Sequence, residues 1–459
     1  MDYVAAGIYC FQPYCVTGEM DPPANPLICP QFVLRFNDLD NIGITGRHYS
    51  GFIMMGIQVF NFPDQFHFFS HECVEFNYNW LTETLQIPPD QITFTEDVWC
   101  GGGNLGPSIE YSVGGLELGN MVFMQYKVAY DGVLTELPIQ VIDVGIGLER
   151  IAWILNGSPT SYVDTFEGSY QFLREKLHLP PKSDQDPDDR LFWEKFGELS
   201  CELNVDDSTD IEKTWDLLAE KLAMEKTEIK TKISLERDLI ILLDHTRTIL
   251  MVIEDGSLPS NIGGGCNVRN ALRRIFSVLH KNKWMEILKM EGLIALFQFH
   301  KKNLEAILGE FPPYKSFSEI IKIEYERWLS TDEKQKASLN KLIKKTKGKL
   351  SIDDWVHAVT TIGVNPDAVA KAGKIDIPSN LYSEIAKGQE KTVKLPDPIL
   401  YDTTNLAPTL NLYETDHKLY KFDACILQVF SNKEMDNLNN IVVLDKSAFY
   451  PTSGGILMF

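Results

Sequence analysis

The stretch "QVIDVGIGLERIAWIL", residues 140–155, places an acid inside strand-like sequence. Apolar, mostly β-branched residues surround Asp143, which is typical of a buried strand, and Gly145 and Gly147 then punctuate the chain. The following "LERIAWIL" has apolar residues at helical spacing, with Arg150 near its start. We therefore predict a strand, a glycine turn and a helix, with a carboxylate that needs a partner because an unpaired buried charge is costly.

The character of the sequence on either side of this stretch divides the chain into three parts. Residues 1–165 are rich in aromatic, glycine and β-branched residues, so we expect an α+β domain with a mainly antiparallel sheet. Residues 166–392 carry helical periodicity over long segments and predict an all-helical domain. Residues 393–459 become strand-like again and predict the first strands of an incomplete β-rich domain.

The composition sets broad limits. The chain has 459 residues, of which 44% are hydrophobic, as in soluble proteins of several domains. It has no long apolar run and no basic flank at the N-terminus, so we expect no membrane span, no signal peptide and a cytoplasmic location. The eight cysteines form no CxxC pair, which favours reduced thiols over a disulfide framework or a zinc knuckle.

Charge is unevenly distributed along the chain. The net charge of −21 argues by itself against a nucleic-acid partner. Acids crowd residues 184–238, however, whereas bases gather in residues 269–349. Because salt screens charges beyond about 10 Å, a local basic face can still hold a polyanion; a solvated helix surface is the alternative.

Simple phosphate-binding motifs do not settle the class. The pattern GxxxxGK[ST] is absent, and Arg150 stands where a dinucleotide fingerprint would need a third glycine. Arg35 lies in "FVLRFNDLDNIGITGRHYSGFIMM", which predicts a long hairpin with this arginine on its first strand. Two arginines beside glycine-bearing turns are compatible with clamping a triphosphate; surface or ion-pair roles are the alternative.

Several quoted segments together carry a family resemblance. "PPANPL", "RFNDLDNIGITGRH", "VWCGGGNLGPSIEYSVGGLE", "MVFMQY" and "VIDVGIGLER" resemble, in order, the catalytic domain of archaeal-type alanyl-tRNA synthetases, a class II aminoacyl-tRNA synthetase family. "LDHTRTILMVIEDGSLPSNIGGG" and "ALRRIF" resemble the helical tRNA-recognition region, and "VVLDKSAFYPTSGG" the start of the β-barrel editing domain. The resemblance implies a class II antiparallel-sheet domain, then a helical domain, then the first editing-domain strands.

The resemblance also implies an activity. Family members join alanine to ATP and then transfer the alanyl group to the 3′ end of tRNA(Ala). Arg35 is similar to the catalytic arginine on the α-phosphate, and Arg150 to the one at the γ-phosphate end, with Mg²⁺ neutralising the phosphates. The nucleophile is a carboxylate that is already ionised, so catalysis needs positioning and charge neutralisation rather than a general base.

The alanine-binding residues follow from the same resemblance. Asp143 is similar to the aspartate that holds the ammonium group of alanine; capping by backbone amides of the following turn is the alternative. Trp99, Val122 and Gly145 match residues that shape the small amino-acid pocket. Rejecting glycine then rests on one methyl group, worth about 1 kcal/mol, so the family needs an editing domain.

The implied tRNA contacts lie in the helical region, where the partner is the acceptor stem of tRNA(Ala). Asn261 matches the asparagine that reads the G·U wobble pair, and Thr360 stands where the family has an aspartate. Thr360 can still form hydrogen bonds but carries no charge. Arg269, Arg273 and Arg274 either contact the RNA backbone or form a solvated helix face.

Some positions depart from the family pattern. The family's motif 1 segment and a cysteine-rich stretch would precede Met1, and the zinc ligands of the editing site would follow Phe459. We therefore expect no complete zinc site and no editing by this chain. Ile53 replaces the glutamate of Phe-Glu-Met, which predicts a changed ATP geometry, and Gly454-Gly455-Ile456 replaces Gly-Gly-Gln.

Two functions of different class remain open. The first is an alanine–tRNA ligase, with a second chain supplying the missing editing and C-terminal parts. The second is a degenerate paralogue that binds tRNA or nucleotide without ligase turnover. A free-standing editing hydrolase is disfavoured because the metal ligands are missing. The retained residues that favour the ligase are Arg35, Trp99, Asp143, Arg150 and Asn261.

Overall fold

The computed structural model describes most of the chain. The described residues are 4–12, 15–129, 132–180, 187–204, 211–261, 263–310, 316–330, 332–346, 348–364, 366–375, 377–387, 406–407, 409–412, 419, 421–430 and 441–448. The predicted boundary at 392/393 and the tripeptide Gly454–Ile456 lie outside these residues.

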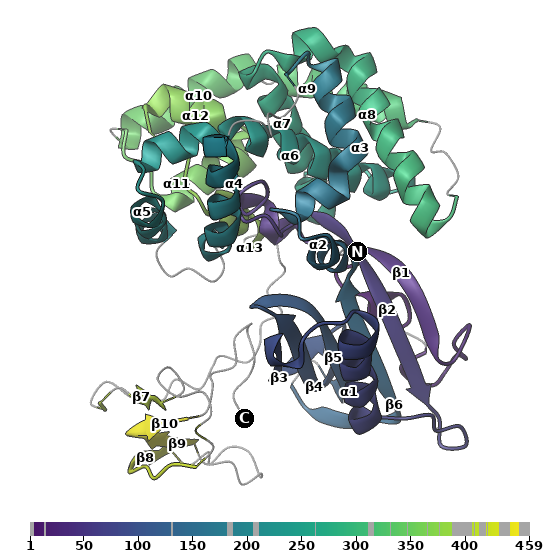
Figure 1. Cartoon of the computed structure of the whole chain (residues 1–459). Coiled ribbons are helices and arrows are strands. Elements are labelled where there is room, and N and C mark those ends of the chain that lie inside the picture. The colour runs from purple at the N-terminus through teal and green to yellow at the C-terminus, as the bar shows by residue number, and fades with distance from the viewer. Residues whose placement is uncertain are drawn as a thin grey trace.

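A six-stranded antiparallel sheet forms the first part of the molecule, in the order β1-β2-β6-β5-β4-β3 (Figure 1). This confirms the predicted α+β class with an antiparallel sheet. Consecutive β1 and β2 pair with each other, so the predicted long hairpin is also confirmed, but Arg35 follows the last residue of β1 instead of lying on it. The strands are β1 (Leu27–Leu34), β2 (Gly51–Asn61), β3 (Ile92–Gly101), β4 (Asn104–Val113), β5 (Leu116–Val128) and β6 (Leu134–Gly147).

Side chains alternate between the two faces of this sheet. In β6, Val144 packs in the core that includes residues of helix α1 (Ser70–Asn79), which lies across one face (Figure 1). Val141 packs in a separate core with the short helix η1 (Gly7–Cys10). Asp143 comes two residues after Val141 in β6, so its side chain points to the same face, which η1 partly covers.

The stretch that ends β6 differs from its prediction in one respect. Gly145 and Gly147 belong to β6, and helix α2 (Leu148–Asn156) begins at the next residue, so the predicted glycine turn is wrong. Gly145 instead permits close packing. A Cβ there would lie 2.9 Å from Met54 Sδ and 3.2 Å from Asn120 Oδ1, closer than side chains normally approach.

A helical region follows the sheet and lies at one end of it (Figure 1). Its described helices are α3 (Ser161–Lys176), α4 (Pro187–Leu199), η5 (Ser200–Leu203), α5 (Ile211–Leu222), α6 (Lys226–Glu254), α7 (Gly263–Lys281), α8 (Trp284–Leu308), α9 (Phe317–Ser330), α10 (Asp332–Thr346), α11 (Ile352–His357), η6 (Ala358–Ile362), α12 (Pro366–Gly373) and α13 (Leu381–Lys387). Of the helices in the described ranges, none is long and apolar enough to cross a membrane.

One hydrophobic core joins the sheet to these helices. Phe32 of β1 and Ile53 of β2 pack in the same cluster as Phe166 of α3, Leu243 of α6 and Phe276 of α7. The predicted domain boundary at residue 165 falls inside α3. The domain boundaries therefore stay a prediction.

Short strands lie near the C-terminus of the described residues. β8 (Ile426–Phe430) pairs antiparallel with β9 (Ile441–Leu444), and β7 (Leu410–Asn411) pairs parallel with β10 (Lys446–Ser447). The predicted return to β structure is confirmed at this level.

Candidate active site

A cavity of about 280 Å³ opens on the face of the sheet where Asp143 lies. Strands β2, β5 and β6 form its floor, and the loop before β2 and the first turn of α2 contribute further walls. The structure brings together in this one cavity all six residues predicted for alanine and ATP: Arg35, Trp99, Val122, Asp143, Gly145 and Arg150.

Asp143 is held in the middle of a strand without a positive partner. It lies opposite Gln58 of β2 and Val122 of β5 and is 5% exposed. Burial raises the pKa of Asp143 to about 6, and a hydrogen bond from Gln58 Nε2 at 2.9 Å opposes this rise. The donor is therefore a side-chain amide of the neighbouring strand, rather than the turn amides considered from the sequence.

The residues around Asp143 are closely packed. Val122 is 1% exposed, and Gly145 leaves no side chain between Met54 and Asn120. Trp99 of β3 forms a partly buried part of the cavity wall. A ligand group next to Asp143 therefore meets apolar groups of Val122, Trp99 and Met54 as well as the polar side chains of Gln58 and Asn120.

The two predicted arginines lie just beyond the ends of β1 and β6, on another side of the cavity from Asp143 inside β6, and already have partners. Arg35 follows β1, and its guanidinium lies 5.3 Å from the centroid of the Phe52 ring. Arg150 is in the first turn of α2, and its Nη1 donates to the Glu117 carbonyl at 2.8 Å and to Glu117 Oε2 at 3.0 Å. Both arginines can turn nitrogen donors toward an anion in the cavity.

Arg47 and His48, which were not predicted from the sequence, also line this cavity. Arg47 lies 5.7 Å from the centroid of the Trp153 ring, and burial lowers its pKa. The Arg47 Nε atom is buried and has no hydrogen-bond partner in the structure. Burial, followed by Arg150, Arg47 and Arg35, lowers the pKa of His48 to about 3, so this imidazole is neutral at physiological pH.

We call Arg35, Arg47, His48 and Arg150 the arginine side of the cavity. Its members were hard to find because Arg47 and His48 belong to the loop between β1 and β2, whose conformation no periodicity reveals. The available signal was the basic pair at the end of "NIGITGRH", just before an apolar strand. With Asp143 on a different side, the cavity can take a ligand that carries both an ammonium group and phosphates.

Ile53 does not contribute to this cavity. Its side chain is 1% exposed and packs in the core shared with the helices, while neighbouring Phe52 and Met54 face the cavity. Alternation along β2 points this side chain to the other face, so an effect of Ile53 on ATP geometry would act through the core, and it stays a prediction. Its backbone N–H instead donates to Glu149 Oε1 and Oε2, at 3.0 and 3.1 Å.

The predicted tRNA-reading residues lie in the helical region. Asn261 is exposed just before α7, and its Oδ1 accepts a hydrogen bond from Arg269 Nη1. Arg269 also forms a two-point ion pair with Glu324, both contacts at 2.9 Å. Thr360 is exposed in η6, and its hydroxyl donates to the Val356 carbonyl at 2.8 Å.

The other two arginines of this group are less accessible. Arg273 is partly buried, and burial, followed by the nearby Arg269, lowers its pKa. Arg274 is 6% exposed, donates to the Leu39 carbonyl and lies 4.5 Å from the centroid of the Tyr382 ring. A solvated face is therefore excluded for Arg274, which bridges α7 and the loop after β1; contact of either arginine with RNA stays a prediction.

Within the described residues, no group of three or more His, Cys, Asp or Glu side chains is arranged to hold a metal ion.

Comparison with known proteins identifies the family. The family model described as "tRNA synthetases class II (A)" matches residues 1–115 and 204–458, so the chain belongs to this family. An alanine–tRNA ligase from Methanocella arvoryzae is 38% identical over 99% of this chain and 50% of its own length. One from Pyrobaculum aerophilum is 34% identical over 98% of this chain and 50% of its own.

These matches confirm the resemblance stated from the sequence and the class II fold. The chain spans about half the length of the curated relatives it matches. Among solved structures, the pyrrolysyl-tRNA synthetase of Desulfitobacterium hafniense covers 25% of this chain at 19% identity with a TM-score of 0.18, a likeness that carries no argument.

Proposed function

We propose that this chain is an alanine–tRNA ligase that activates alanine with ATP and transfers the alanyl group to the 3′ end of tRNA(Ala). The observation that carries the proposal is the polarised cavity, which is lined by Asp143 inside β6 and by the arginine side beyond the ends of β1 and β6. The names of the curated relatives support the choice of alanine.

In the first step, an oxygen of the alanine carboxylate attacks the α-phosphorus of ATP. The bond from that phosphorus to the bridging oxygen of pyrophosphate breaks, which leaves alanyl-adenylate and pyrophosphate. Asp143 holds the ammonium group, and Gly145, Val122 and Trp99 line the space for a small side chain. No general base is needed, because the attacking carboxylate is ionised at neutral pH.

The arginine side binds the phosphates in this proposal. Arg35 neutralises charge that develops at the α-phosphate, and Arg150 holds the far end of the triphosphate. Mg²⁺ would enter with ATP, since this ion is usually held by substrate phosphates, waters and one or two carboxylates. Glu117, 47% exposed beside Arg150, is a carboxylate that fits this role and would help the ion neutralise phosphate charge.

The second step needs the acceptor stem of tRNA(Ala). We assign recognition of its G·U wobble pair to Asn261, with Thr360 as a second polar group and Arg269 and Arg273 near the RNA backbone. Support comes from the exposure of Asn261 and Thr360 in the helical region. A second chain that supplies editing and C-terminal domains, and a cytoplasmic location, stay predictions.

Alanine-dependent exchange of pyrophosphate into ATP by the purified chain tests the first step. We expect exchange with alanine and weaker exchange with glycine and serine, because one methyl or hydroxyl group changes binding only modestly. A folded chain that binds ATP but exchanges with no amino acid would instead be the degenerate paralogue.

Charging of two transcripts of tRNA(Ala) tests the second step. One transcript carries the G·U wobble pair and the other a G·C pair, and both are offered to the wild type and to Asn261→Ala. We expect the wild type to prefer the G·U transcript and the variant to lose this preference. Equal charging of both transcripts by the wild type would contradict the role of Asn261.

A further inference from the structure

The middle of α6 carries five successive buried polar residues, Asp244–Thr248, each at most 6% exposed. The neighbouring turns of α6 are apolar and buried, including Leu239–Leu243 and Ile249–Leu250. Buried polar groups are retained in proteins when partners satisfy them. Partners of Asp244, Arg247 and Thr248 lie outside the helical region, at Ser50 and Glu149 next to the cavity.

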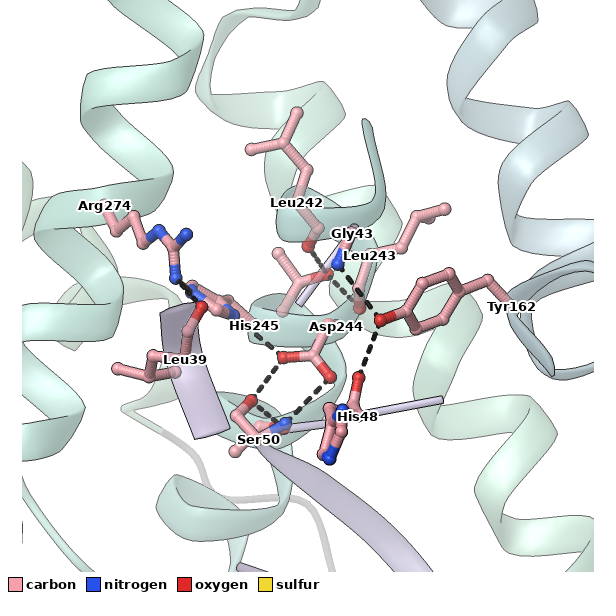
Figure 2. A network of polar contacts seen from close by, with 12 residues as sticks. Leu39, Gly43, His48, Ser50, Tyr162, Leu242, Leu243, Asp244, His245 and Arg274 are labelled. Carbon is pink, nitrogen blue, oxygen red and sulfur yellow. Dashed lines mark hydrogen bonds and ion pairs between the residues drawn. The ribbon is translucent and has the colours of Figure 1, made fainter. Parts of the chain in front are cut away.

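The first contact joins α6 to the residue before β2. Asp244 Oδ1 accepts the backbone N–H of Ser50 at 3.0 Å, and its Oδ2 accepts the Ser50 hydroxyl and His245 Nδ1, the latter at 2.8 Å (Figure 2). The Ser50 hydroxyl also lies 2.8 Å from Thr248 Oγ1. Asp244 therefore fixes both the backbone and the side chain of Ser50 where β2 begins.

The second contact joins α6 to α2 and β2 together. Arg247 Nη2 donates to Glu149 Oε1 at 2.7 Å, and both side chains are nearly buried, at 8% and 7% exposed. Both oxygens of Glu149 accept the N–H of Ile53. Glu149 precedes Arg150 in the chain and lines the cavity itself. Arg247 thus connects the first turn of α2 to the third residue of β2.

Close packing leaves this part of β2 little freedom. A Cβ on Gly51 would lie 2.7 Å from Thr248 Oγ1 and 2.5 Å from the Phe32 ring, so α6 touches the β2 backbone directly. The next residue, Phe52, lines the cavity and carries the Arg35 guanidinium over its ring. A shift of α6 against β2 would therefore move the Phe52 ring and with it Arg35.

We propose that Asp244 and Arg247 are positioning residues that hold the arginine side of the cavity in its phosphate-binding geometry. Arg247 acts through Glu149 on Arg150, and Asp244 acts through Ser50 on Phe52 and Arg35. Neither side chain is among the cavity-lining residues. The inference rests on the proposed function, because it assigns the arginine side to ATP.

The test compares Arg247→Gln and Arg247→Lys with a matched control, Arg174→Gln. Arg174 also forms a nearly buried ion pair, with Glu236 at 2.9 Å, but it lies in α3 and does not line this cavity. Each variant is measured as the full chain for thermal unfolding, for ATP affinity by calorimetry, and for the KM values of ATP and alanine in pyrophosphate exchange.

We expect Arg247→Gln to lower kcat/KM for ATP by about 10- to 100-fold, because a misplacement of about 1 Å costs that much in a preorganised site. The KM for alanine should change less than about threefold, because Asp143 and Gln58 lie outside this network. Arg247→Lys, which keeps the charge, should retain more of the rate. Arg174→Gln should lower the midpoint of thermal unfolding comparably and leave kcat/KM for ATP within about twofold.

A folded Arg247→Gln with wild-type ATP parameters, or one that loses no more than Arg174→Gln, overturns the inference. Equal rises in the KM for ATP and the KM for alanine also overturn it, since that pattern indicates general loosening of the site. A wild type that binds ATP without exchange refutes the proposed function alone; weaker ATP binding by Arg247→Gln than by Arg174→Gln then still supports the positioning role. A wild type that binds no ATP overturns both.

Discussion

The two sides of the cavity hold their charges in different ways. Asp143 is 5% exposed and has a neutral amide as its hydrogen-bond donor, so burial raises its pKa to about 6. Arg150 is 23% exposed in its side chain and already pairs with Glu117. The acid therefore carries a desolvation cost that a bound cation would relieve, whereas the arginine loses little when no ligand is present. Substitutions on both sides should lower activity, but their effects on stability should differ.

The largest effect is expected for Asp143→Asn. The variant removes the partner of a buried ammonium group, worth about 3 kcal/mol or more, so kcat/KM for alanine should fall about 100-fold or more. Its stability should change in the opposite direction at pH 7. The raised pKa means that ionised Asp143 destabilises the fold by at most about 3 kcal/mol, and asparagine removes this cost while still accepting from Gln58.

Pyrophosphate exchange and urea unfolding of the same preparations measure the two effects. The stability difference should be complete above about pH 6 and disappear below about pH 3, because only there is wild-type Asp143 protonated in both the folded and the unfolded chain. An Asp143→Asn variant that is less stable than the wild type at pH 7 would show that Asp143 has a favourable electrostatic partner, and the contrast between the two sides would fail.

Arg150→Ala is expected to lose activity without a matching change in stability. Loss of a charged hydrogen-bond donor to phosphate costs about 2 kcal/mol, so kcat/KM for ATP should fall about 30-fold. The unfolding free energy should change by less than about 1 kcal/mol, because the pair with Glu117 is partly exposed. Arg190→Ala, which breaks the exposed pair with Glu194, is the matched control and should leave exchange unchanged. Equal activity of the two variants would remove Arg150 from the ATP site.

The sequence predicted the cavity residues that lie in strands better than those that lie in the loop between β1 and β2. Alternation along β6 and the family resemblance placed Asp143 in a strand, because strand parity is a local property. Arg47 and His48 were missed because distant contacts set their loop: the Tyr162 hydroxyl of α3 donates to the His48 carbonyl and accepts the Gly43 N–H. The glycine turn was wrong for a similar reason, since the need for glycine at position 145 comes from Met54 across the sheet.

A change of pH should act on the Asp143 side alone. Between pH 7 and pH 5 the ionised fraction of a group with a pKa of about 6 falls about tenfold, so alanine affinity should weaken about tenfold. His48, with a pKa of about 3, stays neutral over this range and contributes nothing to the change. Calorimetric titration with alanine measures the profile, and Asp143→Asn should flatten it. A wild-type profile that is flat from pH 5 to pH 7 would place the pKa of Asp143 well below 6.

The smallest effect is expected from Gly145→Ala, which adds one methyl group beside Asp143. Its Cβ would lie 2.9 Å from Met54 Sδ, and because this side chain is flexible it can move aside at a cost of about 1 kcal/mol. The KM for alanine should therefore rise about fivefold, with a smaller change for glycine, while the KM for ATP stays constant. Gly7→Ala is the matched control, because a Cβ there would contact Met54 Sδ at an ordinary 3.8 Å. A larger rise in the KM for ATP than for alanine would show that Gly145 belongs to the arginine side rather than to the Asp143 side.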